Sequence, residues 1–353
     1  MTVTPIPDVR RETWTATVLN PDGTQIPLAM DQDQPARWTW KQTDQSPLGA
    51  TLHCHGTPPE LRHGQLVLLA YQANGTSYPL PPLVPVIDKP IYEMDGRWFS
   101  IDLIDETINL AADGIDFSVV YDAGAHIVNT CRAVIAASDP SLKVVLPAMD
   151  HTLRNPLDFQ VSTAPLVIVN KLLDALGANP LAPGPDDGVL RSDAWIPPAS
   201  RPVRMRFGPS LLDAGYLPRI DVETDYLAAP NVGHFTADGS QKAGQIVGRW
   251  RDEAPSSPWG IPKRDRRVLA EGKGEAADQT IADEKAMRLV MEARGRGRKA
   301  TITGAFQPVY PGHVITTAHP DHPDLSATWE VTGVSGGTAL GSDTTWELQE
   351  VTG

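Results

Sequence analysis

Histidines at close spacing are the first candidates for chemistry in this sequence. His53, Cys54 and His55 are consecutive, and His63 follows nearby. Alternate residues of a strand point to the same face, so His53 and His55 would present two imidazoles together. Imidazole is a common zinc ligand, so this group could form one corner of a metal site. A fourth ligand is not evident, and a strand with surface histidines is the more common interpretation, so we assign no metal ligand here.

A second candidate is the segment 319–324, which reads His-Pro-Asp-His-Pro-Asp. His319 and His322 lie close to Asp321 and Asp324, and the prolines restrict the backbone between them. Such a group could bind a metal or exchange protons, which would suit a metal-dependent hydrolase. The more common interpretation is an exposed hairpin tip, and we assign no function to it.

Two pairs of adjacent carboxylates could suggest acid–base catalysis. They are Asp105 with Glu106 and Asp252 with Glu253. Neighbouring residues of a strand point to opposite faces, so neither pair is suited to share a substrate. The sequence also lacks a Gly-x-Ser-x-Gly elbow, a P-loop, a His-Glu-x-x-His motif and paired Cys-x-x-Cys motifs. We therefore predict no catalytic, cofactor-binding or metal-binding residue, and no enzyme.

Aromatic and basic groups suggest binding rather than catalysis. The chain has nine tryptophans. Trp38 and Trp40 could line a sugar site, although burial in a core or an interface is the usual place for this residue type. The cations of segment 294–299 are interleaved with glycines and could bind phosphate or an acidic neighbouring subunit. Favourable charges at a helix C-terminus are the interpretation we prefer for them. The four cations are Arg294, Arg296, Arg298 and Lys299.

One helix is the clearest element that the sequence predicts. Thr280 is its predicted N-cap, with Asp283 three residues later as the reciprocal partner. Small and apolar residues recur at helical spacing on one face, which suits close packing on a sheet or barrel. Gly295 and Gly297 are expected to end the helix. The face consists of Ala282, Ala286, Leu289, Val290 and Ala293.

The remaining chain reads as short strands around a segment with two further helices. Turn residues separate the strands before residue 110, and the proline-rich segment 79–90 reads as an edge or crossing strand. Helices are expected at 125–137 and at 163–177, the latter with Thr163 as its cap and Gly177 as its end. We predict a mainly β fold with an α+β insert. Its three domains are 1–110, β-barrel-like; 111–225, α/β; and 226–353, β-barrel-like with one packed helix.

Composition limits the classes of protein that fit. The 353 residues carry a formal net charge of -13, which disfavours a protein that reads nucleic-acid sequence through a basic face. A hydrophobic fraction of 41% is ordinary for a globular protein, and 33 prolines with 29 glycines fit many turns. We expect no disulfide framework, no signal peptide and no membrane segment, and folding in a reducing cytosol.

Taken in order, these parts resemble the tail hub or baseplate hub proteins of siphophages, minor tail proteins whose fold is related to the central hub of contractile phage tails. The resemblance covers most of the chain, and the N-terminal tryptophan-rich part matches it least well. The stretches that carry it are 98–105 with 108–110, 122–125, 163–177, 229–232, 256–258, the helix that begins near Thr280, and 310–314.

The resemblance implies a structural virion protein of a bacteriophage, located at the tail tip and assembled in the host cytoplasm. Family members form a homotrimeric ring in which each chain contributes two similar barrels. The ring joins a hexameric tail tube to a threefold tip and encloses the channel through which DNA leaves. The implied partners are distal tail or tail-tube, tail-tip or fibre, and tape measure proteins, and genomic DNA passes without specific binding. An acidic chain suits such a channel, because it repels phosphate. The alternative is a carbohydrate-binding or host-contacting tail-tip protein.

Overall fold

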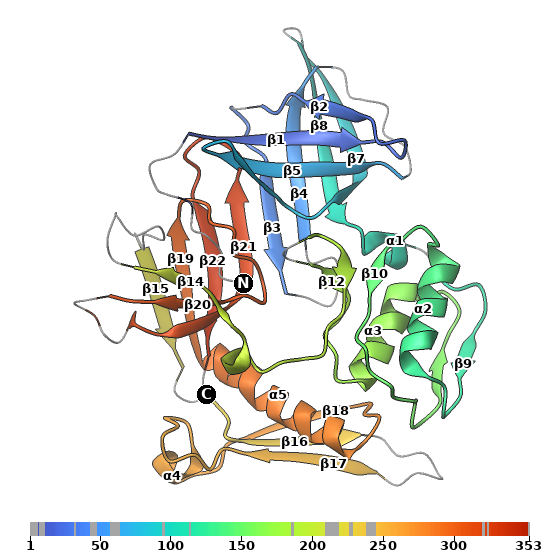
Figure 1. Cartoon of the computed structure of the whole chain (residues 1–353), viewed down its shortest axis with the longest axis vertical. Helices are drawn as coiled ribbons and strands as arrows, with labels where there is room; N and C mark the ends of the chain where they lie inside the picture. Colours follow the sequence, from blue (N-terminus) through green and yellow to red (C-terminus); the bar gives the residue numbers. More distant parts are fainter. Residues whose placement is uncertain are drawn as a thin grey trace.

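The chain folds mainly as β-sheet, as predicted, with an α-helical segment between two β regions (Figure 1). Strands make up 43% and helices 18% of it. The computed structural model describes residues 6, 11–31, 33–42, 48–56, 64–93, 96–112, 114–184, 187–208, 219–225, 229–237, 245–319, 322 and 325–351. Of residues 87–93, 96, 97 and 296 only the backbone is described. None of the described helices is long and apolar enough to cross a membrane.

A 14-stranded sheet contains strands from both ends of the chain. Its main path runs β15–β19–β22–β21–β3–β4–β8–β7–β5–β1–β2, and no barrel closes among the described strands. β6 pairs with β5, and β20 joins β14 to β21. The strands are β1 Glu12–Leu19, β2 Gln25–Leu28, β3 Arg37–Lys41, β4 Leu48–His55, β5 Leu66–Ala73, β6 Thr76–Pro79, β7 Leu83–Glu93, β8 Gly96–Asp105, β14 Val203–Phe207, β15 Arg219–Thr224, β19 Arg298–Gly304, β20 Val314–Thr317, β21 Thr328–Gly337 and β22 Thr344–Glu350.

The two β regions are continuous with each other through β3 and β21. These strands are antiparallel, and Val334 pairs with Trp40. Trp38 packs in one core with Trp14 and Phe306, whose ring centroids lie 5.8 and 6.1 Å away. That core contains buried residues from both ends of the chain. The expectation of two separate β modules therefore needs correction, because burial of these large side chains joins the modules. The proposed domain boundaries stay a prediction.

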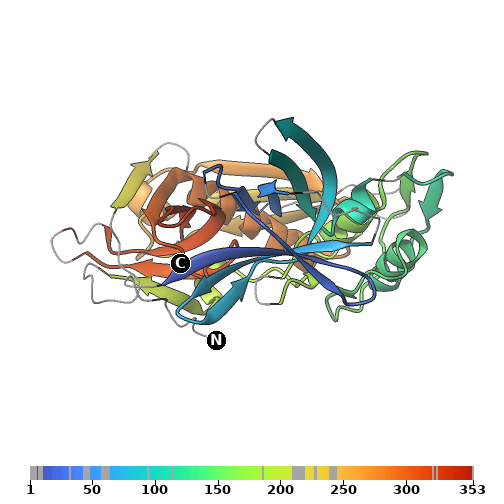
Figure 2. The same ribbon diagram turned by 90° about the horizontal axis from the view of Figure 1, so that it is seen from above.

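The helical segment has a core of its own beside the large sheet (Figures 1 and 2). The helices expected at 125–137 and 163–177 are confirmed. The second begins at an Ala164 cap and a proline, whereas the predicted cap Thr163 donates its hydroxyl hydrogen bond to the Gln160 carbonyl. Gly177, at φ +69°, follows its end. The segment comprises α1 Ile108–Ala111, β9 Val119–Tyr121, α2 Ile127–Ser138, β10 Val144–Val145, β11 Leu157–Phe159, α3 Pro165–Ala175, β12 Ala182–Pro183, β13 Leu190–Arg191 and the short 3-10 turn Pro198–Ser200.

A long helix, α5, covers one face of a separate three-stranded sheet (Figure 1). The Asp278 side chain caps it by accepting a hydrogen bond from the Ile281 N–H at 2.9 Å, so the cap is not Thr280. Asp283 instead accepts from the Arg249 N–H at 2.8 Å, which ties the helix to β17. The elements are β16 Val232–Ala237, β17 Ile246–Arg251, α4 Ile261–Arg264, β18 Leu269–Gly274 and α5 Gln279–Gly297.

The end of α5 differs from its prediction. The helix continues through Gly295 and Gly297, and β19 begins at the next residue. Gly295 is buried and packs closely on the Gln349 side chain, which would have to move to admit a larger residue. The helix therefore passes into the large sheet without an intervening loop.

The predicted small face of α5 is confirmed, and it lies directly on strand glycines. Ala282 and Ala286 are fully buried. A Cβ atom added at Gly248 would lie 1.9 Å from the Ala282 carbonyl oxygen, and one at Gly233 would lie 2.1 Å from that of Ala286. The helix backbone thus touches the sheet, because neither surface carries a side chain larger than a methyl group at these points.

We expect Gly248→Ala to destabilise the protein by about 3 kcal/mol, because overpacking at a backbone contact forces the helix off the sheet. Thermal unfolding followed by circular dichroism would show a midpoint several degrees below that of the wild type. Gly49→Ala is the matched control, since its added Cβ would meet the Leu103 carbonyl oxygen at an ordinary 3.4 Å. Equal midpoints for the two variants would contradict the close contact.

Candidate functional site

One of the two histidines of β4, His55, lies beside a buried carboxylate. His55 Nε2 is 3.3 Å from Asp31 Oδ1, and its ring lies 3.7 Å from that of Trp98. Cys54 is buried on the opposite face, where desolvation raises the pKa of its thiol to about 12. His63 lies outside the described residues. Within the described ranges, no group of three or more His, Cys, Asp or Glu residues could hold a metal.

The second histidine group is only partly described. The rings of His319 and His322 lie 4.7 Å apart. Asp321 and Asp324, which the hydrolase hypothesis also needs, lie outside the described residues. The two rings alone provide no nucleophile and no metal site.

The adjacent carboxylates do not lie on strands as pairs: Asp105 ends β8 and Glu106 is in the following turn, while Asp252 and Glu253 come after β17. Asp105 is fully buried and accepts hydrogen bonds from the backbone N–H groups of Leu48 and Thr107, each at 2.9 Å. Burial raises the pKa of Asp105, and burial with nearby carboxylates raises the pKa of Glu106. Asp105 therefore joins β4 to the start of the helical segment, which is a structural role.

The two tryptophans considered for a sugar site are core residues. Trp38 is 1% and Trp40 3% exposed. The Trp40 ring lies 4.9 Å from that of Tyr310. Trp38 has no exposed ring face, and Trp40, which lines the groove described below, is almost fully covered. Neither ring is open enough for a sugar to stack on it.

The predicted basic group at residues 294–299 is dispersed. Arg294 is buried, Arg298 forms an ion pair with Glu350, and Lys299 is exposed. The Arg296 side chain lies outside the described atoms. Arg294 does lie in the last turn of α5, as expected for a favourable helix-end charge, but it is buried, two turns after Ala286 on the face that packs against β16 and β17.

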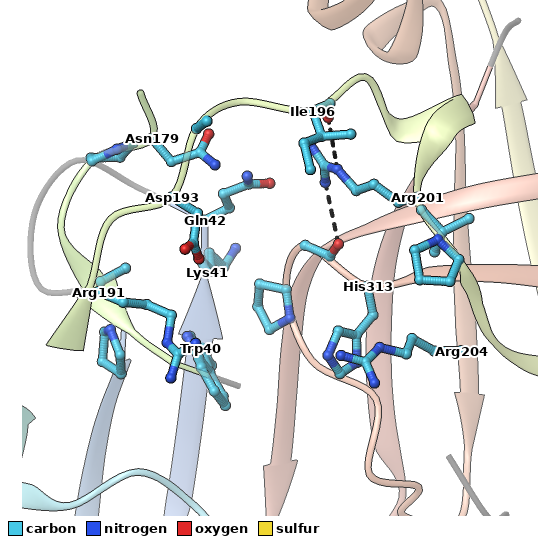
Figure 3. Close-up of a pocket in the computed structure, with 18 residues that line it drawn as sticks. Trp40, Lys41, Gln42, Asn179, Arg191, Asp193, Ile196, Arg201, Arg204 and His313 are labelled. Carbon is cyan, nitrogen blue, oxygen red and sulfur yellow. Dashed lines mark hydrogen bonds between the residues drawn. The ribbon is translucent and has the colours of Figure 1, made fainter. Parts of the chain in front are cut away.

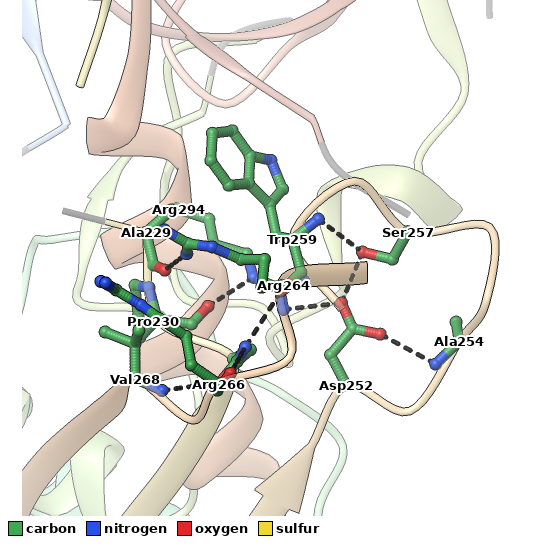
Figure 4. A network of polar contacts seen from close by, with 11 residues as sticks. Ala229, Pro230, Asp252, Ala254, Ser257, Trp259, Arg264, Arg266, Val268 and Arg294 are labelled. Atoms are coloured by element: carbon green, nitrogen blue, oxygen red, sulfur yellow. Dashed lines mark hydrogen bonds and ion pairs between the residues drawn. The ribbon is translucent and has the colours of Figure 1, made fainter. Parts of the chain in front are cut away.

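Arg294 is the centre of a buried polar network (Figure 4). Its Nη2 lies 2.6 Å from Asp252 Oδ2, and its Nε donates to the Pro230 carbonyl at 2.7 Å. The guanidinium also lies over the Trp250 ring, 5.3 Å from the centroid. Burial lowers the pKa of Arg294 and the Asp252 charge opposes that shift. A buried cation needs a nearby counter-charge, and Asp252 supplies it for Arg294.

The same network holds the loop between β17 and β18. Asp252 accepts hydrogen bonds from the Ser257 hydroxyl at 2.5 Å and the Ala254 N–H at 3.1 Å. Asn231, fully buried, donates to the Arg266 carbonyl at 2.9 Å and accepts from the Val268 N–H at 2.8 Å. This role of Asn231 and Asp252 could not be predicted from the sequence, because the partners are separated in sequence and follow no motif.

A groove of about 590 Å³ lies where the large sheet meets the helical segment (Figure 3). Its cations already serve the fold. Arg201 donates to the carbonyls of Ile196 and Gly312 and pairs with Glu330 at 2.6 Å. The other pairs at the groove are Lys41 with Glu347 and Arg191 with Asp187. We therefore assign it no ligand.

We expect Asp252→Ala to destabilise the protein by about 3–5 kcal/mol, because it leaves Arg294 buried without a counter-charge. Asp221→Ala is the control, since Asp221 pairs with Arg219 at 3.0 Å with both side chains well exposed. That variant should stay within about 0.5 kcal/mol of the wild type in chemical denaturation. A small effect of Asp252→Ala would show that Arg294 reaches solvent or another acceptor.

Solved structures share this architecture although their sequences differ. The tail protein from Neisseria meningitidis MC58 superposes with a TM-score of 0.66 at 15% identity, over 96% of this chain and 97% of that one. The prophage MuSo2 43 kDa tail protein from Shewanella oneidensis gives 0.63 at 12%, over 95% and 98%. The E. coli c3393 protein, a type VI secretion component with structural similarity to T4 bacteriophage tail proteins gp27 and gp5, gives 0.57 at 10%, over 95% and 76%.

No protein-family model matches the chain, and no curated protein sequence matches it. The likeness is therefore one of fold. It extends along nearly the whole chain, including both β regions and the helical segment between them. The chain has the fold of phage tail proteins and of hub-like proteins of secretion systems, as the sequence resemblance predicts.

Proposed function

We propose that the chain is a structural hub protein of a phage tail. The observation that carries this proposal is the superposition on a tail protein over 96% of this chain and 97% of the other. A match over nearly the full length of both chains supports a shared architecture more strongly than a match to one segment would. The proteins that share it are described as tail components, which supports a non-enzymatic role.

In this proposal three copies form a ring that joins the hexameric tail tube to the tail tip and encloses the DNA channel. The domains 1–110, 111–225 and 226–353 would then supply two ring-forming β regions and an outer insert. The open sheet supports assembly, because its terminal strands β15 and β2 each pair on one side only among the described strands. The net charge of -13 favours passage of DNA without adhesion.

The proposed location is the virion, at the tail tip, after assembly in the host cytoplasm. Contacts with distal tail or tail-tube, tail-tip or fibre, and tape measure proteins follow from this position. The alternative, a carbohydrate-binding tip protein, has no supporting observation, because Trp38 and Trp40 are buried.

The test is to produce the chain with a peptide tag in cells that assemble the particles, and to purify those particles. We expect the tag in intact tails at three copies per particle, with threefold density below the tube in electron cryomicroscopy. The chain should be lost from the pellet when tail assembly is blocked. Tails that lack the chain, or that carry six copies, would contradict the proposed hub.

A further inference from the structure

Exposed cations lie on the outer side of the three-stranded sheet and on the loop between β17 and β18. The sheet register directs Gly233 and Gly248 toward α5, so alternate residues of β17 and β18 point outward. We call the resulting surface the basic face. It consists of the outward-facing Arg249, Arg251 and Lys273 together with the loop residues Lys263, Arg266 and Arg267, all exposed.

The charge of this region is opposite to that of the whole chain. Residues 249–273 contain seven Lys or Arg and four Asp or Glu, whereas the chain contains 30 and 43. The remaining residues are therefore more acidic than the total suggests. This reversal is readable in the sequence, as the run Lys-Arg-Asp-Arg-Arg at 263–267, but it has no part in the fold-based proposal above.

The cations of the basic face are also unengaged. Within the described part of the chain, none of the six forms an ion pair, whereas Lys285, Arg294 and Arg298 each pair with a carboxylate. Unpaired like charges repel one another, so their clustering destabilises the free chain slightly. An acidic surface laid against them would remove that repulsion.

The composition of the face favours a protein partner over a phosphate polymer. Leu269 is 46% exposed in the cross-strand row that contains Arg251, and Glu271 lies in the same row as Arg249, with His234 of β16 between them. Arginine with exposed apolar residues is typical of protein interfaces. A carboxylate within the face would instead repel the closely spaced phosphates of DNA.

The face is held in place before any partner arrives. Asn231 and Asp252 fix the backbone of the loop through the buried bonds described above, and α5 supports the sheet from behind. A preformed surface loses less conformational entropy on binding.

We propose that the basic face docks on an acidic surface of a second copy of this chain. This inference rests on the ring proposed above. The contact joins two different surfaces, so it is head-to-tail and can close into a ring. The strongly acidic remainder of the chain supplies the complementary charge.

The test compares three full-length proteins by sedimentation velocity up to about 100 µM protomer, at about 50 mM and about 500 mM salt. One is the wild type, one carries Arg249→Glu, Arg251→Glu and Arg267→Glu, and the third is the matched control. The control carries Lys143→Glu, Arg206→Glu and Lys299→Glu. Its three positions are exposed cations outside the basic face, so the change in net charge is the same. Thermal unfolding checks that each protein is folded.

We expect the wild type and the control to self-associate at low salt and to dissociate at high salt. The basic-face variant should associate at least about tenfold more weakly. A monomeric wild type, or equal weakening in both variants, would overturn the proposal. The proposal would also be overturned if the wild type did not self-associate but bound DNA, and only the basic-face variant lost that binding. Copy number in purified tails tests the hub separately, because a chain can enter tails through another surface.

Discussion

The contact of α5 with the glycines of β16 and β17 is the constraint on which the lower half of the molecule depends. Alanine opposite glycine lets two backbones touch, and only this separation brings Arg294 within reach of Asp252. The same helix then enters the large sheet as β19. A small-residue face is therefore more than a packing detail here, because it sets the position of a sheet, a buried charge and a long loop together.

Buried charges lie where separate parts of the chain meet. Arg294 joins α5 to the β17 loop, and Lys285 joins α5 to α3 through Asp174 at 2.7 Å. Burial lowers the pKa of Lys285, while the neighbouring Asp174 opposes that shift. Asp105 joins β4 to the helical segment through backbone donors. Such groups add little net stability, but a misplaced junction would leave each one unpaired, which makes wrong arrangements costly.

Local features could be predicted from the sequence, and long-range partners could not. The small face of α5, the proline start of α3 and most strands follow from periodicity and turn chemistry. The pairing of β3 with β21 joins residues about 300 positions apart, and no local pattern encodes it. The N-cap of α5 is Asp278 rather than the predicted Thr280. Both side chains carry an oxygen that can cap a helix, and tertiary contacts determine which of them does so. The burial of Trp38 and Arg294 likewise depends on elements that only the fold brings together.

The absence of a loop between α5 and β19 has a mechanical consequence. A helix of 19 residues is a rod of about 28 Å, and it continues into a strand hydrogen-bonded on both edges. A shift of α5 therefore moves the first residue of β19 with it, because no connecting loop lies between them to take up the displacement.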